Sequence, residues 1–144
     1  MRNTDLAAAI EQYEQRAAHY WPLEVREVRE EPAKSVSADL VREKEGVRLS
    51  DAVPASAHLV ACDPGGAQKT SEEFSAWLQG EREKGHDVAF VIGGAYGLSP
   101  ELRKRARTRL SLAPWTLPHE LARLVLAEQL YRAGSIQKRE PYHK

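Results

Sequence analysis

The stretch DVAFVIGGAYGLSP, residues 87–100, holds a short apolar run, three glycines and a Ser-Pro pair. A run of this length bounded by turn residues predicts a buried strand over residues 87–92. Closely spaced glycines predict a chain that turns sharply or lets another group approach its backbone. Ser99 followed by Pro100 is typical of a helix start and predicts a short helix to about Thr108.

The same pattern occurs on both sides of this stretch. The run AHLVAC, residues 57–62, predicts another buried strand, and the DPGG that follows predicts a turn. Periodicity, with a capping-box pair at Thr70 and Glu73, predicts further elements. These are helices over residues 4–20, 36–50, 70–84 and 118–133, and strands over residues 23–28 and 110–112. Alternating strands and helices indicate an α/β fold with a largely parallel sheet. Ligands of such sheets bind beyond the carboxyl ends of the strands, here CDPGG and IGGAYG.

Length and composition limit the class of protein. A chain of 144 residues with 42% hydrophobic and 29% charged residues is typical of one soluble domain, residues 1–144. No apolar run is long enough for a membrane span, and the N-terminus does not resemble a signal peptide. One cysteine excludes an intrachain disulfide, and no spacing of metal ligands is present, so we expect no metal site. A reducing cytoplasm is the expected location.

Charge is distributed unevenly along the chain. Residues 1–100 carry a net charge of −6 and residues 101–144 a net charge of +6. The run RKRARTR, residues 103–109, is a candidate for contacts with nucleic-acid phosphates, although a solvated helix face would have the same composition. Three aromatic residues could stack on bases or, alternatively, pack in the core: Trp115, Tyr131 and Tyr142.

Common catalytic motifs are missing. The GGAYG run has neither the spacing of a dinucleotide-binding loop nor that of a P-loop, so by itself it fits a tight strand-to-helix turn. No serine lies in a nucleophile elbow. Cys62 follows a buried strand, which favours a packing role over that of a nucleophile.

Three segments in a fixed order resemble the RlmH family. They are IGGAYGLSP at residues 92–100, SLAPWTLPHELARLVLAEQLYRA at 111–133, and EPYHK at 140–144. The resemblance extends from about residue 3 to the C-terminus. Members of this family are SPOUT-class methyltransferases that use S-adenosylmethionine to modify N3 of a pseudouridine in 23S ribosomal RNA, favouring the assembled ribosome. The resemblance implies a SPOUT-type sheet flanked by helices, a C-terminal trefoil knot and a homodimer that shares its active sites.

The resemblance also assigns roles to residues. Cys62 and Asp63 would lie at the first cofactor loop and Gly94 at the second. The third cofactor loop would consist of Ala113, Pro114, Trp115, Thr116, Leu117 and Pro118. Tyr142 and His143 would lie at the catalytic centre, with His143 as a candidate base. Alternatively, water takes the proton and the tail only binds RNA. The expected RNA-binding residues are Arg103, Lys104, Arg105, Arg107 and Lys144.

The chain departs from the family pattern at three places. Family members begin with a strand before the first helix, and here that first strand is expected to be missing. They commonly carry an aromatic residue where Gly134 stands and a serine where Ala113 stands. Two rival hypotheses remain open: a catalytically silent protein that binds RNA or the ribosome, and a flavodoxin-like nucleotide-binding module.

Overall fold

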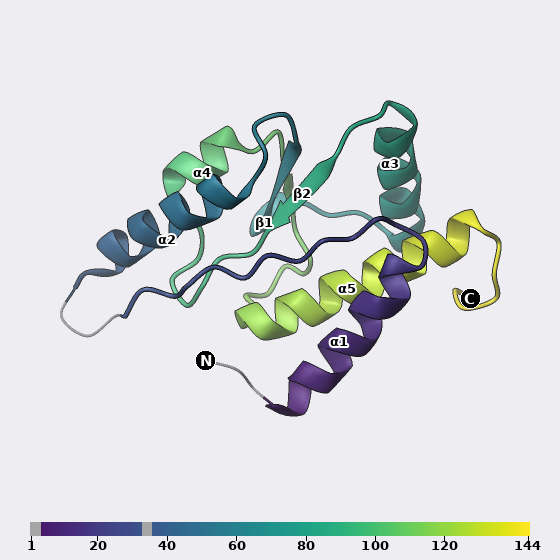
Figure 1. Ribbon diagram of the computed structural model, residues 1–144, viewed down its shortest axis with the longest axis horizontal. Coiled ribbons are helices and arrows are strands. Elements are labelled where there is room, and N and C mark those ends of the chain that lie inside the picture. Colours follow the sequence, from purple (N-terminus) through teal and green to yellow (C-terminus); the bar gives the residue numbers. More distant parts are fainter. Residues whose placement is uncertain (1–3, 33–35) are drawn as a thin grey trace. The chain divides into compact units, whose positions relative to one another are not determined.

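The computed structural model describes residues 4–32 and 36–144 (Figure 1). The chain divides into two compact units, each built from separate segments. The helical unit comprises Met1–Val25, Lys69–Gly85 and Glu120–Lys144, and the sheet unit comprises Arg26–Gln68 and His86–His119. Among the described residues, no helix is both long and apolar enough to cross a membrane. The single domain over residues 1–144 stays a prediction.

The sheet unit contains three parallel strands in the order β2-β1-β3. They are β1 (His58–Ala67), β2 (Val88–Val91) and β3 (Thr108–Leu110). This arrangement confirms the predicted α/β fold with a parallel sheet. The last strand begins two residues earlier than predicted because the Arg107 amide already donates to the Leu59 carbonyl, at 2.9 Å.

The predicted turn at DPGG is wrong, since β1 runs through it. The pairing with β3 shifts there: Cys62 and Ala67 both lie opposite Leu110, so the residues between them form a bulge. A Cβ on Gly66 would lie 2.6 Å from the carbonyl carbon of Arg109. Glycine therefore permits the close passage of two backbones, and the sharp local bend sits inside a strand.

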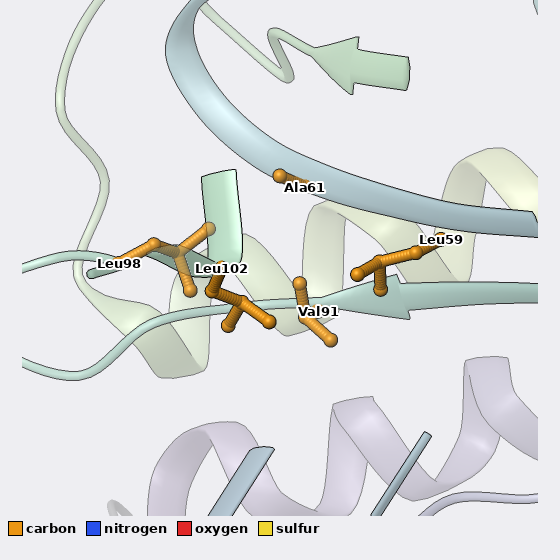
Figure 2. Packing of buried hydrophobic residues seen from close by; sticks show 5 residues of the cluster. All are labelled: Leu59, Ala61, Val91, Leu98 and Leu102. Carbon is orange, nitrogen blue, oxygen red and sulfur yellow. The ribbon is translucent and has the colours of Figure 1, made fainter. Parts of the chain in front are cut away.

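Two helices of the sheet unit, α2 (Ala38–Ala52) and α4 (Pro100–Arg105), lie beside each other (Figure 1). Ser37 and Ser99 cap them, each accepting a hydrogen bond from the amide three residues later, at 3.2 Å. The helix α4 ends three residues before the predicted Thr108 because the chain enters β3. Figure 2 shows the apolar cluster that α4 shares with the strands, formed by Leu59, Ala61, Val91, Leu98 and Leu102. Each fully buried leucine or valine contributes about 1.5–3 kcal/mol.

The helical unit consists of α1 (Thr4–Ala18), α3 (Ser71–Glu83) and most of α5 (His119–Gln137). Hydrogen bonds from polar side chains connect the segments of this unit. The Trp21 indole donates to the Leu130 carbonyl and the Ser75 hydroxyl to that of Ala133, both at 2.8 Å. The predicted capping box of α3 is confirmed: the Glu73 amide donates to Thr70 Oγ1 at 3.0 Å, and the Thr70 amide to Glu73 Oε1 at 2.8 Å.

Two further predictions need correction. Residues 23–28, expected to form a strand, have no regular structure, and none of the described strands pairs with them. Val25 is 46% exposed there, so the alternating pattern does not mark a buried sheet face. The helix predicted to end at residue 133 continues through Gly134 to Gln137.

Candidate cofactor loops, basic segment and C-terminal tail

The first predicted cofactor loop lies within β1, and the other two follow β2 and β3 of the same parallel sheet. Because the strands are parallel, their carboxyl ends lie at the same edge of the sheet. Cys62 and Asp63 lie in the bulged end of β1, Gly94 follows β2, and residues 113–118 follow β3. The fold thus brings to one sheet edge segments that are up to 56 residues apart in the sequence.

In the first loop, Asp63 is engaged by the protein itself. Its carboxylate accepts hydrogen bonds from the Gly65 amide at 3.1 Å and from Arg109 Nε at 3.1 Å, and Arg103 lies 3.9 Å away. These contacts fix the bulge and engage the Asp63 carboxylate within the chain. Burial raises the pKa of the Cys62 thiol to about 12, which keeps it protonated and unsuited to nucleophilic attack at neutral pH.

In the second loop, the glycines are required by the loop's own path. The Gly97 amide donates to the Gly94 carbonyl at 3.0 Å, and Gly97 has φ +81°, a conformation that side chains disfavour. A Cβ on Gly93 would lie 2.6 Å from the carbonyl carbon of Gly97. The loop therefore folds back on itself, with Gly94 and Gly97 paired across the turn.

The helix α2 packs directly against this loop. Arg42 donates to the Tyr96 carbonyl at 3.3 Å. Gly46 lies where any Cβ would collide with the Ser99 hydroxyl, which explains a glycine inside a helix. A Cβ on Gly94 would lie 2.7 Å from Oε1 of Glu45. The sequence did not predict a role for Glu45. The available signal was its position next to Gly46, a glycine inside a helix.

The third loop is held at its start and exposed at its centre. The Ser111 amide donates to the Ala67 carbonyl at 2.8 Å, and the Ser111 hydroxyl donates to the Ala113 carbonyl at 2.7 Å. Trp115 is 78% exposed. The side chains and backbone groups of this loop are therefore accessible to a ligand, with Ala113 and Leu117 partly buried and Pro114, Thr116 and Pro118 exposed.

The basic segment lies on α4 and its exit. All four predicted RNA-binding residues of this segment are exposed, namely Arg103, Lys104, Arg105 and Arg107. Arg105 also donates to the Ser50 carbonyl at 3.0 Å. Arg109, which the prediction omitted although it belongs to the same run, is exposed as well and holds Asp63. The segment presents a concentrated positive charge to solvent.

The tail residues Tyr142 and His143 belong to the helical unit, where α5 and α3 hold them. His143 Nδ1 accepts a hydrogen bond from Arg132 Nη1 at 3.0 Å, since a guanidinium can only donate. His143 Nε2 lies 3.3 Å from Glu72 Oε2 and donates to it. Both contacts together fix the neutral tautomer with its proton on Nε2. Lys144 is exposed at the end of the tail.

Tyr142 is bound through Glu128 on α5. Its hydroxyl donates to Glu128 Oε2 at 2.8 Å, and Arg132 lies 4.9 Å from the centre of its ring. Burial and the Glu128 carboxylate raise the pKa of Tyr142, so it remains a phenol at neutral pH. The sequence reasoning missed Arg132 and Glu128, although their i,i+4 spacing of opposite charges predicts a pair on a helix.

The sheet unit has three loops at the carboxyl edge of a parallel sheet and an exposed basic segment. This arrangement is typical of α/β proteins that bind ligands at that edge. A family model described as "Predicted SPOUT methyltransferase" matches residues 1–143, and the chain belongs to this family. The family resemblance that the sequence motifs indicated is therefore confirmed.

Three similar proteins carry the same name. A protein of Gemmatimonas aurantiaca named "Ribosomal RNA large subunit methyltransferase H" is 63% identical over 143 residues, covering 99% of this chain and 93% of that protein. A Bacillus thuringiensis protein of the same name is 44% identical over 144 residues, covering 96% of this chain and 91% of that protein. A Bacillus anthracis protein of this name has the same identity and coverage.

Proposed function

We propose that this protein is an S-adenosylmethionine-dependent methyltransferase that modifies N3 of a pseudouridine in 23S ribosomal RNA. The main support is the 63% identity, over almost the full chain, with a protein named for methylation of large-subunit ribosomal RNA. The exposed basic segment is consistent with a polyanionic substrate. The substrate is the assembled ribosome, and the protein acts in the cytoplasm.

The sheet edge has features that fit the cofactor. Glu45 Oε1 is a buried acceptor without a hydrogen-bond partner in the described part of the chain, and it lies against the second loop. The exposed Trp115 offers an aromatic face for a purine. The residues that would hold the cofactor are the backbone of Cys62 and Asp63, Gly94, and residues 113–118. When bound, the cofactor supplies an electrophilic methyl group, and the protein contributes binding and orientation.

Within the tail, His143 is the candidate acceptor of the proton that the pseudouridine N3 must lose. In the observed geometry the Nδ1 lone pair is occupied by Arg132. Proton uptake at Nδ1 therefore requires Arg132 to move away, while Glu72 stays positioned to stabilise the resulting imidazolium. If water accepts the proton instead, His143 and Tyr142 bind and orient the base. Tyr142, as a phenol, supplies a hydrogen bond or a stacking face in either case.

The functional assembly is a homodimer of a single SPOUT domain with a C-terminal trefoil knot. Three apolar residues of α5, Leu121, Leu124 and Val125, remain partly exposed, whereas Leu130 is buried. An apolar stripe of this kind supports packing against a second copy. In such a dimer, the cofactor loops of one copy and the tail of the other would form one active site.

Two measurements test this function. Calorimetry with S-adenosylmethionine should detect binding to the sheet edge. Single-turnover transfer of a labelled methyl group should modify assembled 70S ribosomes faster than free 23S RNA. Cofactor binding without transfer to either RNA would favour a silent ribosome-binding protein. Transfer to RNA lacking the pseudouridine would overturn the proposed substrate.

A further inference from the structure

Glu45 on α2 places a buried carboxylate against the glycine-rich loop. The residue is 7% exposed. Its Oε2 accepts a hydrogen bond from the Glu31 amide at 3.0 Å, whereas its Oε1 has no hydrogen-bond partner in the described ranges 4–32 and 36–144. The position of a Cβ on Gly94 would be 2.7 Å from Oε1 and 3.2 Å from Oε2. The unpaired oxygen therefore faces the backbone of Gly94.

A buried acceptor without a donor is rare, because its desolvation is not compensated. Nearby basic residues of α2 are engaged elsewhere. Lys44 Nζ lies 3.6 Å and Arg48 Nη2 lies 2.7 Å from the carboxylate of Glu31. Arg42 contacts Asp39 and the Tyr96 carbonyl. These cations of α2 serve other acceptors, and a donor from outside the chain would satisfy Oε1 of Glu45.

We propose that Glu45 binds the cofactor, with Oε1 accepting a hydrogen bond from bound S-adenosylmethionine. The inference rests on the proposed function, which places the cofactor at the Gly94 loop. The cofactor carries an ammonium group and ribose hydroxyls as donors, and its sulfonium gives it a net positive charge at neutral pH. A carboxylate in a poorly solvated site attracts that charge. The demethylated product lacks the sulfonium charge, so Glu45 favours substrate over product.

The test compares Glu45→Gln with the wild-type protein by calorimetry, using S-adenosylmethionine and S-adenosylhomocysteine separately. The variant keeps the shape of the side chain and removes its charge. We expect affinity for S-adenosylmethionine to fall by about tenfold or more, and affinity for S-adenosylhomocysteine to fall less. Glu43→Gln, an exposed residue of the same helix, is the matched control and should bind both ligands as the wild type does.

A second measurement distinguishes cofactor binding by Glu45 from a role of Glu45 in supporting the loop of residues 93–98. Amide hydrogen exchange of residues 93–98 without ligand should be the same in Glu45→Gln and in the wild type. Faster exchange in the variant, with both ligands weakened equally, would make Glu45 a support for the loop and overturn the proposal. Unchanged affinity for both ligands would also overturn it. If the wild type binds neither ligand, the proposed function itself fails, which is a different result.

Discussion

The ring of Tyr20 occupies the space where a side chain at position 134 would lie. Gly134 is a buried residue of α5, and Tyr20 follows α1. The Tyr20 ring also lies 5.8 Å from that of Tyr131, and its hydroxyl donates to Glu140 Oε1 at 2.7 Å. An aromatic ring from another segment thus fills the place where the family resemblance implies an aromatic side chain at position 134. The same ring connects α1 to the segment that leads into the tail.

Gly134→Trp should therefore destabilise the protein, because two aromatic rings would compete for one space. We expect a loss of about 1–3 kcal/mol in the free energy of unfolding, measured by urea denaturation. The double variant Gly134→Trp with Tyr20→Ala should recover part of this loss. Gly80→Ala on α3 is the control, because its Cβ meets no other atom within 4 Å, and it should stabilise by up to about 1 kcal/mol. Equal destabilisation in the single and double variants would contradict the view that Tyr20 and a side chain at position 134 compete for the same space.

Features of the fold that depend on nearby residues were predictable. The caps at Ser99 and at Thr70 with Glu73 are local hydrogen bonds, and the short apolar runs form strands. The burial predicted for residues 87–92 is wrong in part, since Val91 alone of the four β2 residues is buried. The DPGG segment was not predictable, because a turn and a bulge have the same composition and differ only in pairing with β3. Residues 23–28 were predicted to form a strand and do not. An alternating pattern forms no strand unless another strand pairs with it.

The candidate site, like the fold, could be predicted from the sequence only in part. The cofactor loops could be placed because parallel strands bring their carboxyl ends to one edge. The partners of the loops and of the tail could not, since Glu45 lies 49 residues before Gly94 and Glu72 lies 71 residues before His143. Contacts over such separations depend on how helices pack, and no local pattern encodes them.

The single cysteine, Cys62, gives a test of desolvation at the first predicted cofactor loop. The pKa of Cys62 is raised by burial to about 12, against about 8.5 for a free thiol. A raised pKa means that this thiol's contribution to stability is complete below about pH 8.5 and is lost as the pH rises toward 12. Unfolding measured by urea at pH 8 and pH 10 should therefore show a larger loss in the wild type than in Cys62→Ala. Equal losses, or rapid alkylation of the folded protein at pH 8, would contradict a thiol whose charged form is disfavoured by desolvation.

Gly94→Val should abolish detectable binding of S-adenosylmethionine while leaving RNA affinity largely intact. The structure gives a reason other than backbone strain, because the loop glycine with positive φ is Gly97 and a side chain at position 94 would strike the Glu45 carboxylate. Calorimetry and RNA filter binding measure the two affinities. Cofactor affinity within a few-fold of the wild type would place the cofactor away from this loop.

Neutralising Lys104 and Arg107 should weaken RNA binding and flatten its salt dependence. These two residues are chosen because Arg103 and Arg105 also have intramolecular contacts. For every phosphate that the protein no longer neutralises, the slope of log affinity against log salt should fall by about one. Replacing Lys84 and Lys138 by glutamine gives a control with the same change in net charge. An equal effect from the control pair would indicate a general charge effect and no specific role of the basic segment.

His143→Ala should lower single-turnover methylation by roughly 10²-fold or more if His143 accepts the proton. Cofactor affinity should stay unchanged, because the side chains that hold His143, Arg132 on α5 and Glu72 on α3, belong to the helical unit. Transfer of a labelled methyl group to ribosomes at saturating enzyme, repeated from about pH 6 to 9, measures the rate and its pH dependence.

The variant Glu72→Gln distinguishes two roles of His143, which are accepting the proton and positioning the substrate. The amide can still accept the hydrogen bond from Nε2 but cannot stabilise an imidazolium by charge. If His143 is the base, this variant should move the acid limb of the pH profile to lower pH, since loss of a neighbouring negative charge makes the imidazole harder to protonate. A profile identical to the wild type in both variants would remove His143 from proton transfer. A loss confined to the apparent affinity for ribosomes would instead make it a substrate-binding residue that Arg132 and Glu72 hold in place.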